Sequence, residues 1–181
     1  SDRPNGELDL GECSVILPNR SMTEVRPGDV VDMPLGARKA SAWHPEDLLL
    51  AGPMRRLGHW SSQEIATNLA SLVDYGKTLL GSDDDRLSVA EIVARPRHSS
   101  LQLVRVVSPK FFWTTSMSGN AQLRGMLSIR GKWIDLSVTD VAAEASFRGR
   151  REPATIDEAL LTISLSTPFA PRGATEQYCF K

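Results

Sequence analysis

Five β-prone runs separated by short turn segments fill most of residues 101–169, and they constrain the fold more than any other feature of the sequence. Each run is rich in β-branched and aromatic residues, and most connections have the length of hairpin loops. Strands connected in this way pair with their neighbours, so the pattern predicts a small barrel or sandwich. The runs are LQLVRVV (101–107), FFWTTS (111–116), LRGMLSIRG (123–131), WIDLSVTD (133–140) and ALLTISLSTPF (159–169).

Alternation of apolar and polar residues predicts which face of these strands is buried. In the run 133–140, Ile134, Leu136 and Val138 alternate with polar residues, and the run 159–169 repeats the pattern. A period of two places alternate side chains on opposite faces, so one face packs in a core and the other meets water. Trp133 falls on the polar register, which makes its ring a candidate for a ligand surface.

The first sixty residues carry shorter strand signals. CSVIL (13–17) is one β-prone run, and the turn Pro27-Gly28-Asp29 leads into VVDMPL, which predicts another. Residues 36–60 combine Gly, Pro, Trp and His without a sustained period. We expect them to form an ordered excursion that is packed by its own aromatic side chains.

One amphipathic helix is predicted between the two strand-rich regions. Ser61 and Glu64 have the spacing of a capping box, and apolar residues recur at helical spacing from Ile65 to Val73. The helix is expected to end near Gly76. A short apolar stretch, VAEIV, is then stopped by Pro96, where we place the main boundary of the chain.

Charge is sorted along the chain although the formal net charge is only −1. Residues 1–94 hold 9 Lys and Arg against 15 Asp and Glu, whereas residues 95–151 hold 10 against 3. An acidic half followed by a basic segment indicates an anionic partner for the latter. The overall composition, 41% hydrophobic and 24% charged, is that of a globular protein.

The same sequence argues against several other classes of protein. Cys13 and Cys179 stand alone, which predicts neither a zinc site nor a disulfide scaffold, and the chain lacks an apolar run long enough to span a membrane. We therefore expect a cytoplasmic protein without membrane contact, metal or cofactor. Motifs of hydrolases and deaminases are missing, so no catalytic residue is assigned and an enzyme is disfavoured. His44 lies beside Glu46 and Asp47, but this acidic pair after Pro45 predicts the start of a helix more than a metal or acid-base site.

Several segments in succession resemble the dual-OB domain family of bacterial conflict and nucleic-acid modification systems. They are PGDVVDMPL, WHPEDLLL, LGHW, LQLVRV, GKWIDLSVTD and EALLTISLSTPF ahead of YCFK. The resemblance implies a mainly β chain with two OB-like small barrels and a connecting helical region. The first barrel is expected to be incomplete, because strands that family members place before GECSVILPNRS are missing here. The expected organisation is a first part-barrel with its excursion (1–60), a helical connection (61–97) and a second barrel (98–181).

The basic segment is the favoured binding site. Clustered Lys and Arg neutralise phosphates, and aromatic rings on an OB barrel stack on bases. We expect non-catalytic recognition of nucleic acid or a nucleotide, with single-stranded DNA or RNA favoured. The alternative is a scaffold subunit that holds a partner enzyme of the same defence system through the acidic half. The predicted nucleic-acid-binding residues are Arg105, Lys110, Arg124, Arg130, Lys132, Trp133, Arg148, Arg150 and Arg151.

Overall fold

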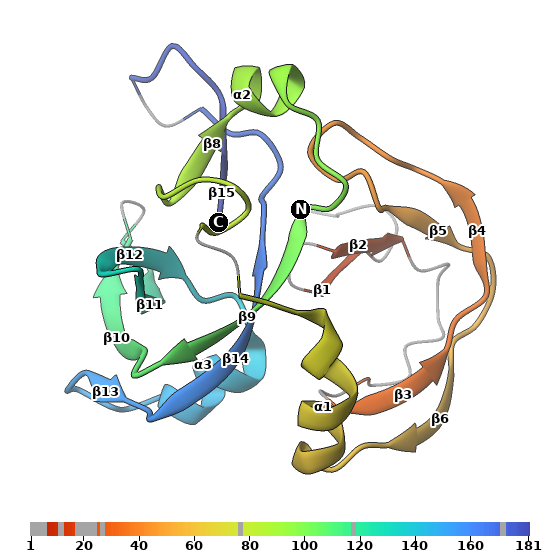
Figure 1. The fold of residues 1–181 in the computed structure, drawn as a ribbon, viewed down its shortest axis with the longest axis horizontal. Coiled ribbons are helices and arrows are strands. Elements are labelled where there is room, and N and C mark those ends of the chain that lie inside the picture. Colours follow the sequence, from red (N-terminus) through yellow and green to blue (C-terminus); the bar gives the residue numbers. More distant parts are fainter. Residues whose placement is uncertain are drawn as a thin grey trace.

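The chain forms two strand-rich halves that meet beside helix α1 (Ser62–Leu69), as Figure 1 shows. The computed structural model describes residues 7–10, 13–16, 25, 28–75, 78–116, 119–170 and 173–181. Strands predominate among them, which confirms the mainly β fold class. The first half contains β1 (Glu7–Leu10), β2 (Cys13–Ile16), β3 (Asp29–Asp32), β4 (Leu35–Arg38), β5 (Leu48–Leu50) and β6 (Arg55–His59).

The second half carries the longer strands and two further helices, α2 (Val89–Ala94) and α3 (Val141–Phe147). A 3-10 turn, η1 (Ala70–Leu72), extends α1. No helix within the described ranges is long and apolar enough to cross a membrane. The strands of this half are β7 (Val73–Asp74), β8 (Arg86–Ser88), β9 (Leu101–Val107), β10 (Lys110–Thr115), β11 (Ala121–Ile129), β12 (Lys132–Ser137), β13 (Ala154–Thr155), β14 (Glu158–Ser164) and β15 (Tyr178–Phe180).

Antiparallel ribbons build the first half. β1 pairs with β2, β3 with β6, and β4 with β5. The last two ribbons curve along one side of the molecule as an open arc (Figure 1), and the strands described in this half do not close into a barrel. The prediction that residues 36–60 form an ordered excursion is wrong in part, because β5, β6 and most of β4 lie within this range. All residues of β4 and β6 are exposed, so neither strand has a buried face that would give an alternating pattern.

Two sheets enclose the core of the second half. One has the strand order β12-β11-β10-β13 and the other the order β14-β9-β7. Their buried side chains form one apolar cluster with residues from α2, β8 and β15. The five runs predicted between residues 101 and 169 all contain strands. The cluster contains Leu79, Leu80, Leu87, Ile92, Val104, Val106, Leu127, Ile134, Leu136, Ile163, Leu165 and Cys179.

The predicted alternation decides which side chains enter this core. Ile134 and Leu136 are buried whereas Asp135 between them is exposed, and Ile163 and Leu165 are buried in the same way. A one-residue slip of either strand would move these apolar side chains to water, so the pattern fixes the register.

Two capping boxes begin the first two helices. The Ser61 hydroxyl accepts a hydrogen bond from the Glu64 N–H (3.3 Å), and the Glu64 carboxylate accepts one from the Ser61 N–H (2.8 Å). Ser88 and Glu91 repeat the arrangement at α2. The predicted end of the first helix is wrong, because α1 stops at Leu69 and the chain enters β7, which pairs with β9. Sheet pairing therefore overrides the helical spacing, and Gly76 lies outside the described residues.

Helix α3 lies in the connection before β13, inside the basic segment, where no helix was predicted from the sequence. Asp140 caps it, since its carboxylate accepts a hydrogen bond from the Ala143 N–H (2.6 Å). The helix spans seven residues and none of them is buried, so its apolar spacing is too short to be recognised as a period.

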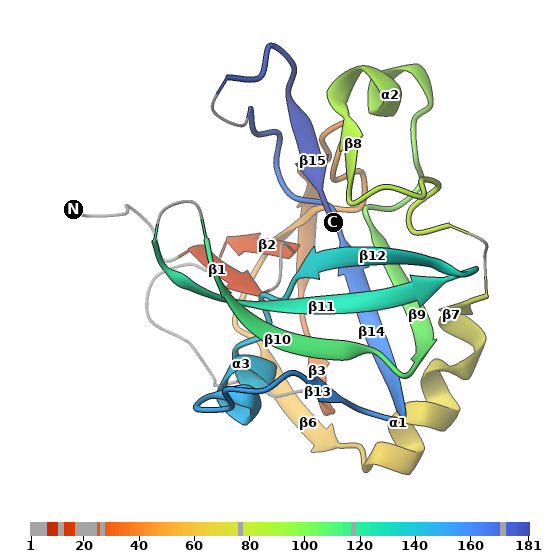
Figure 2. The same cartoon turned by 90° about the vertical axis from the view of Figure 1, so that its left-hand side faces the viewer.

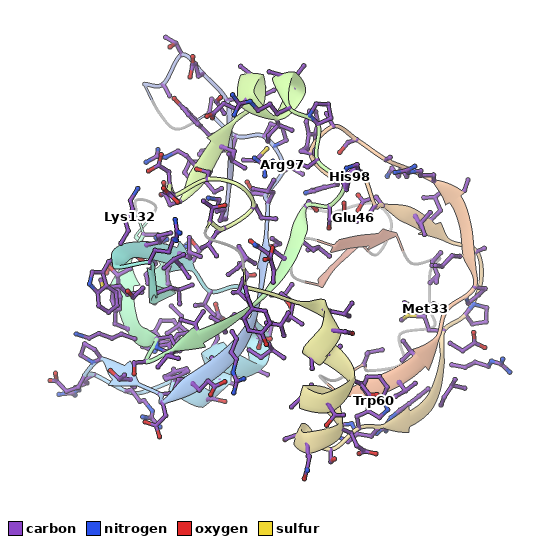
Figure 3. All side chains as sticks on the ribbon, in the orientation of Figure 1. Met33, Glu46, Trp60, Arg97, His98 and Lys132 are labelled. Atoms are coloured by element: carbon purple, nitrogen blue, oxygen red, sulfur yellow. The ribbon has the colours of Figure 1, made fainter. Side chains whose placement is uncertain are left out.

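The connection between β4 and β5 joins the two halves. His44 is buried with Nε2 2.8 Å from the Leu165 carbonyl oxygen. The Glu46 carboxylate accepts hydrogen bonds from the N–H (3.0 Å) and the hydroxyl of Ser100. Figure 3 shows Glu46 at this junction. The helix predicted to start at Glu46 and Asp47 is wrong, because the segment forms turns that lead into β5 and Glu46 instead caps a distant N–H.

The junction gives the first testable prediction. Ser100 is only 2% exposed, so the change Glu46→Ala leaves its N–H and hydroxyl buried without this acceptor. We expect the free energy of unfolding to fall by about 1–3 kcal/mol, measured by urea denaturation. The control Glu152→Ala removes an exposed glutamate after α3 and should leave the midpoint unchanged. Equal midpoints for both variants would contradict the prediction.

Candidate nucleic-acid interface

The outer face of β10, β11 and β12 is the best candidate surface of the second half. In Figure 2 these three strands run side by side across the front of the molecule. The register places Phe112 opposite Arg124, and Met126 lies between Lys110 on β10 and Asp135 on β12. Neighbouring residues of opposite parity, such as Leu123, Leu127 and Ile134, are buried on the inner face. We call the residues Lys110, Phe112, Arg124, Met126, Ser128, Trp133, Asp135 and Ser137 the outer face.

Arg124 lies along this face and is held by β12. Its Nε donates to Asp135 Oδ1 (2.9 Å), its Nη1 to Ser137 Oγ (2.6 Å) and its Nη2 to the Asp135 carbonyl oxygen (3.0 Å). The side chain is 20% exposed. Three of the five guanidinium N–H groups are therefore used within the sheet, and the positive charge of Arg124 is paired with Asp135. The part of the guanidinium group that is exposed remains at the surface.

The tip of the β11–β12 hairpin presents the most accessible groups. Arg130 and Gly131 both have positive φ, 54° and 81°, as a two-residue type I′ turn requires. Arginine is an unusual residue for this conformation, in which Asn and Gly are favoured. Next to the turn, Trp133 exposes 58% of its surface. The hairpin thus places a cation and a flat ring close together at one end of the outer face.

Lys132 follows the turn but is paired with an acidic residue from the segment between β7 and β8. Its Nζ lies 3.1 Å from Asp84 Oδ1. The hydrogen bond from Lys132, followed by its positive charge, lowers the pKa of the Asp84 carboxyl. A pocket of about 270 Å³ lies here, lined by Asp83, Asp84, Asp85, Arg124, Lys132, Trp133, Ile134 and Asp135.

A second cluster surrounds α3. The Trp113 indole N–H donates to the Phe147 carbonyl oxygen (2.8 Å), and the rings of Phe111 and Phe147 stack with centroids 4.9 Å apart. Arg150 lies over the Phe147 ring at 5.5 Å. These rings pack α3 against the sheet, so Phe111 and Trp113 act inside the fold. The loop that follows presents exposed Arg148, Arg150 and Arg151.

The structure divides the predicted binding residues into several places. Arg130, Lys132 and Trp133 lie at the hairpin tip, whereas α3 and its loop follow the opposite end of β12; Figure 2 shows these two ends far apart. Arg105 forms an ion pair with Glu158 on β14. Among the described residues, no ion pair involves Lys110, Arg130 or the three arginines after α3.

Sequence reasoning missed the acidic partner of this surface. The SDDDR segment is visible as a charge run, but 48 positions separate Asp84 from Lys132, so the contact has no local signal. Met126 was also missed as an outer-face residue, although the strand register would have identified it. Within the described ranges, no group of three or more His, Cys, Asp or Glu residues has an arrangement that could hold a metal ion.

The Lys132–Asp84 contact can be tested by titration. In the change Lys132→Ala, the pKa of Asp84 should rise towards the usual aspartate value of about 3.9. A lowered carboxyl pKa in the folded state stabilises the fold above the unfolded pKa, and this contribution is lost as the pH falls through the folded pKa. Carbon-detected NMR titration measures the change. Glu91, whose pKa is lowered by hydrogen bonds from Ser88, is the internal control and should titrate as in the wild type. An unchanged Asp84 would rule out the contact.

Comparison with known proteins identifies the family to which this chain belongs. The family model described as the dual OB-containing domain matches residues 2–181, nearly the whole chain. No curated protein and no solved structure matches the sequence. The match agrees with the two strand-rich halves and with the small sheets of the second half. This chain belongs to the dual OB-containing domain family.

Proposed function

We propose that the protein binds single-stranded nucleic acid through the outer face of β10, β11 and β12. Membership of a dual OB-containing family supports an oligonucleotide-binding role, since OB folds use a strand face and its loops to bind nucleic acid. The single observation that carries the proposal for this face is the exposed indole of Trp133 beside the cationic turn residue Arg130.

The chemistry of the face divides into two tasks. The exposed ring of Trp133 and the half-buried ring of Phe112 offer aromatic surface for bases, and the cations Arg130 and Lys110 offer charge for phosphates. The loop with Arg148, Arg150 and Arg151 would meet a strand that continues past the other end of the sheet. A strand running along β12 would pass both groups of cations in succession.

We further propose that the role is recognition without catalysis, in a bacterial defence or nucleic-acid modification system. The resemblance of the C-terminal segments to the dual-OB domain family of such systems supports this assignment. The sequence contains no motif of a hydrolase or a deaminase, and this is the reason for preferring recognition.

Salt dependence is the direct test of binding. Wild-type protein is titrated with single- and double-stranded DNA and RNA at about 50 mM and about 200 mM salt, and affinity should fall steeply with salt for single strands. The change Arg130→Asn should reduce the slope of log affinity against log salt by about 0.7, because one phosphate contact is lost. Asparagine tolerates positive φ, so the fold should be retained.

A matched variant and a triple variant locate the contacts. Arg55→Gln removes an exposed cation from the first half and should leave the slope unchanged. The Arg148, Arg150 and Arg151 triple alanine variant should weaken binding further. If the protein binds and neither Arg130→Asn nor the triple variant binds more weakly, the binding surface lies elsewhere.

Stacking on Trp133 gives an independent prediction. The change Trp133→Ala should weaken binding by about 1–3 kcal/mol, the range for one base stacked on an aromatic side chain. Because stacking is not a charge effect, the salt slope should stay the same. Isothermal titration calorimetry at two salt concentrations measures both quantities, and Trp133→Phe should recover part of the affinity. A change in slope with no change in affinity at high salt would contradict a stacking role.

A scaffold subunit that holds a partner enzyme remains the second candidate. The observation that favours it is the exposure of Leu35 (55%) and Leu57 (65%) on the ribbons of the first half. Exposed apolar side chains that gather on a surface are typical of sites that bind protein. Failure of every oligonucleotide to bind at low salt would favour this function over the first.

A further inference from the structure

The acidic turn formed by Ser82, Asp83, Asp84 and Asp85 lies against the hairpin end of the outer face. All three aspartates line the same pocket as Lys132 and Trp133. Figure 3 marks Lys132 on this side of the molecule. The ring proposed to stack on bases and Lys132, which the sequence predicted as a phosphate contact, therefore share a pocket wall with three carboxylates.

The acidic turn is held in place by hydrogen bonds to its backbone, several of them from Lys181. Lys181 Nζ donates to the carbonyl oxygens of Ser82 (2.9 Å) and Asp84, and the Lys181 N–H donates to that of Asp85 (2.8 Å). Ser82 and Leu79 also exchange two backbone hydrogen bonds. Burial, and then the nearby charge of Arg97, lowers the pKa of Lys181 to about 8, so the group is charged at pH 7. The carboxylates are thus presented by an anchored turn.

The Asp84 carboxylate binds the Lys132 ammonium group at the position where a phosphate oxygen would bind it. Its carboxylate is 73% exposed and lies 3.1 Å from the ammonium group. Both carboxylate and phosphate are anionic oxygen acceptors for an ammonium group, so they compete for the same donor. Asp83 and Asp85 add negative charge at the same place and repel an approaching backbone.

We infer that the acidic turn is an autoinhibitory contact, in which Asp84 holds Lys132 and must be displaced before nucleic acid engages this end of the face. The inference rests on the proposed function, because it concerns regulation of the same surface. The turn lowers the affinity of the resting protein and favours ligands with enough phosphates to displace the carboxylate.

Neutralising the turn should raise affinity. The change Asp84→Asn removes the competitor and one negative charge, and we expect affinity for a single-stranded oligonucleotide to rise by about threefold to tenfold at about 50 mM salt. The gain should shrink as salt screens the charges. Asp83→Asn, which leaves the ion pair in place, should give a smaller gain. The matched control is Asp32→Asn, which breaks an exposed Arg55–Asp32 ion pair in the first half and should change affinity little.

A double-mutant cycle separates competition from a simple charge effect. In wild-type protein Lys132 is occupied, so Lys132→Ala should weaken binding by less than about twofold. With Asp84→Asn present, Lys132 is released, and the same change should weaken binding by about fivefold. Equal effects of Lys132→Ala in both backgrounds would overturn the inference.

The outcomes distinguish the inference from the proposed function. If wild-type protein binds with a steep salt dependence and Asp84→Asn does not bind more tightly, the autoinhibitory contact is wrong and the function stands. If only Asp84→Asn binds, both are supported. If neither protein binds any oligonucleotide at about 50 mM salt, the function fails and the inference fails with it.

Discussion

The register of β11 against β12 is the constraint on which the rest of the second half depends. Leu127 and Ile134 stand opposite each other and are both buried, so the pleat turns every alternate side chain of the hairpin outward. The core and the candidate surface are therefore two consequences of one pairing. Trp133 is exposed because its neighbour Ile134 is not, and the two-residue turn at Arg130 and Gly131 is the shortest connection that keeps this register.

Electrostatics on this surface depend on internal pairing more than on the number of cations. Arg124 is bound along β12, Arg105 is paired with Glu158, and Lys132 is held by the acidic turn. Cations so engaged add less to phosphate binding than a count of charges suggests, because a carboxylate must be displaced or its repulsion overcome. For the proposed nucleic-acid binding, such a surface implies a moderate affinity that depends on ligand length.

Local sequence patterns were sufficient for the five longer strands of the second half, β9 to β12 and β14, and insufficient for its shorter strands and for the site. Strict alternation around Ile134 and Ile163 identified buried faces, and capping-box spacing identified the start of α1. Strands β4 and β6 and the short helix α3 contain no buried residue, so no pattern of burial signals them in the sequence. The composition of the basic segment indicated cations, but the contact of Lys132 with Asp84 joins distant parts of the chain. Such pairings are set by tertiary packing and leave no period in the sequence.

The junction at His44 has a consequence for synthesis of the chain. Its partner, the Leu165 carbonyl, lies 121 positions further on, and Ser100, the partner of Glu46, lies 54 positions on. The ribosome synthesises the β4–β5 connection before Ser100 and Leu165. Until these partners are synthesised, the polar groups of His44 and Glu46 can only be hydrated by water. The contact of the first half with Leu165 therefore forms only after β14 has left the exit tunnel, so the junction between the two strand-rich halves is completed last.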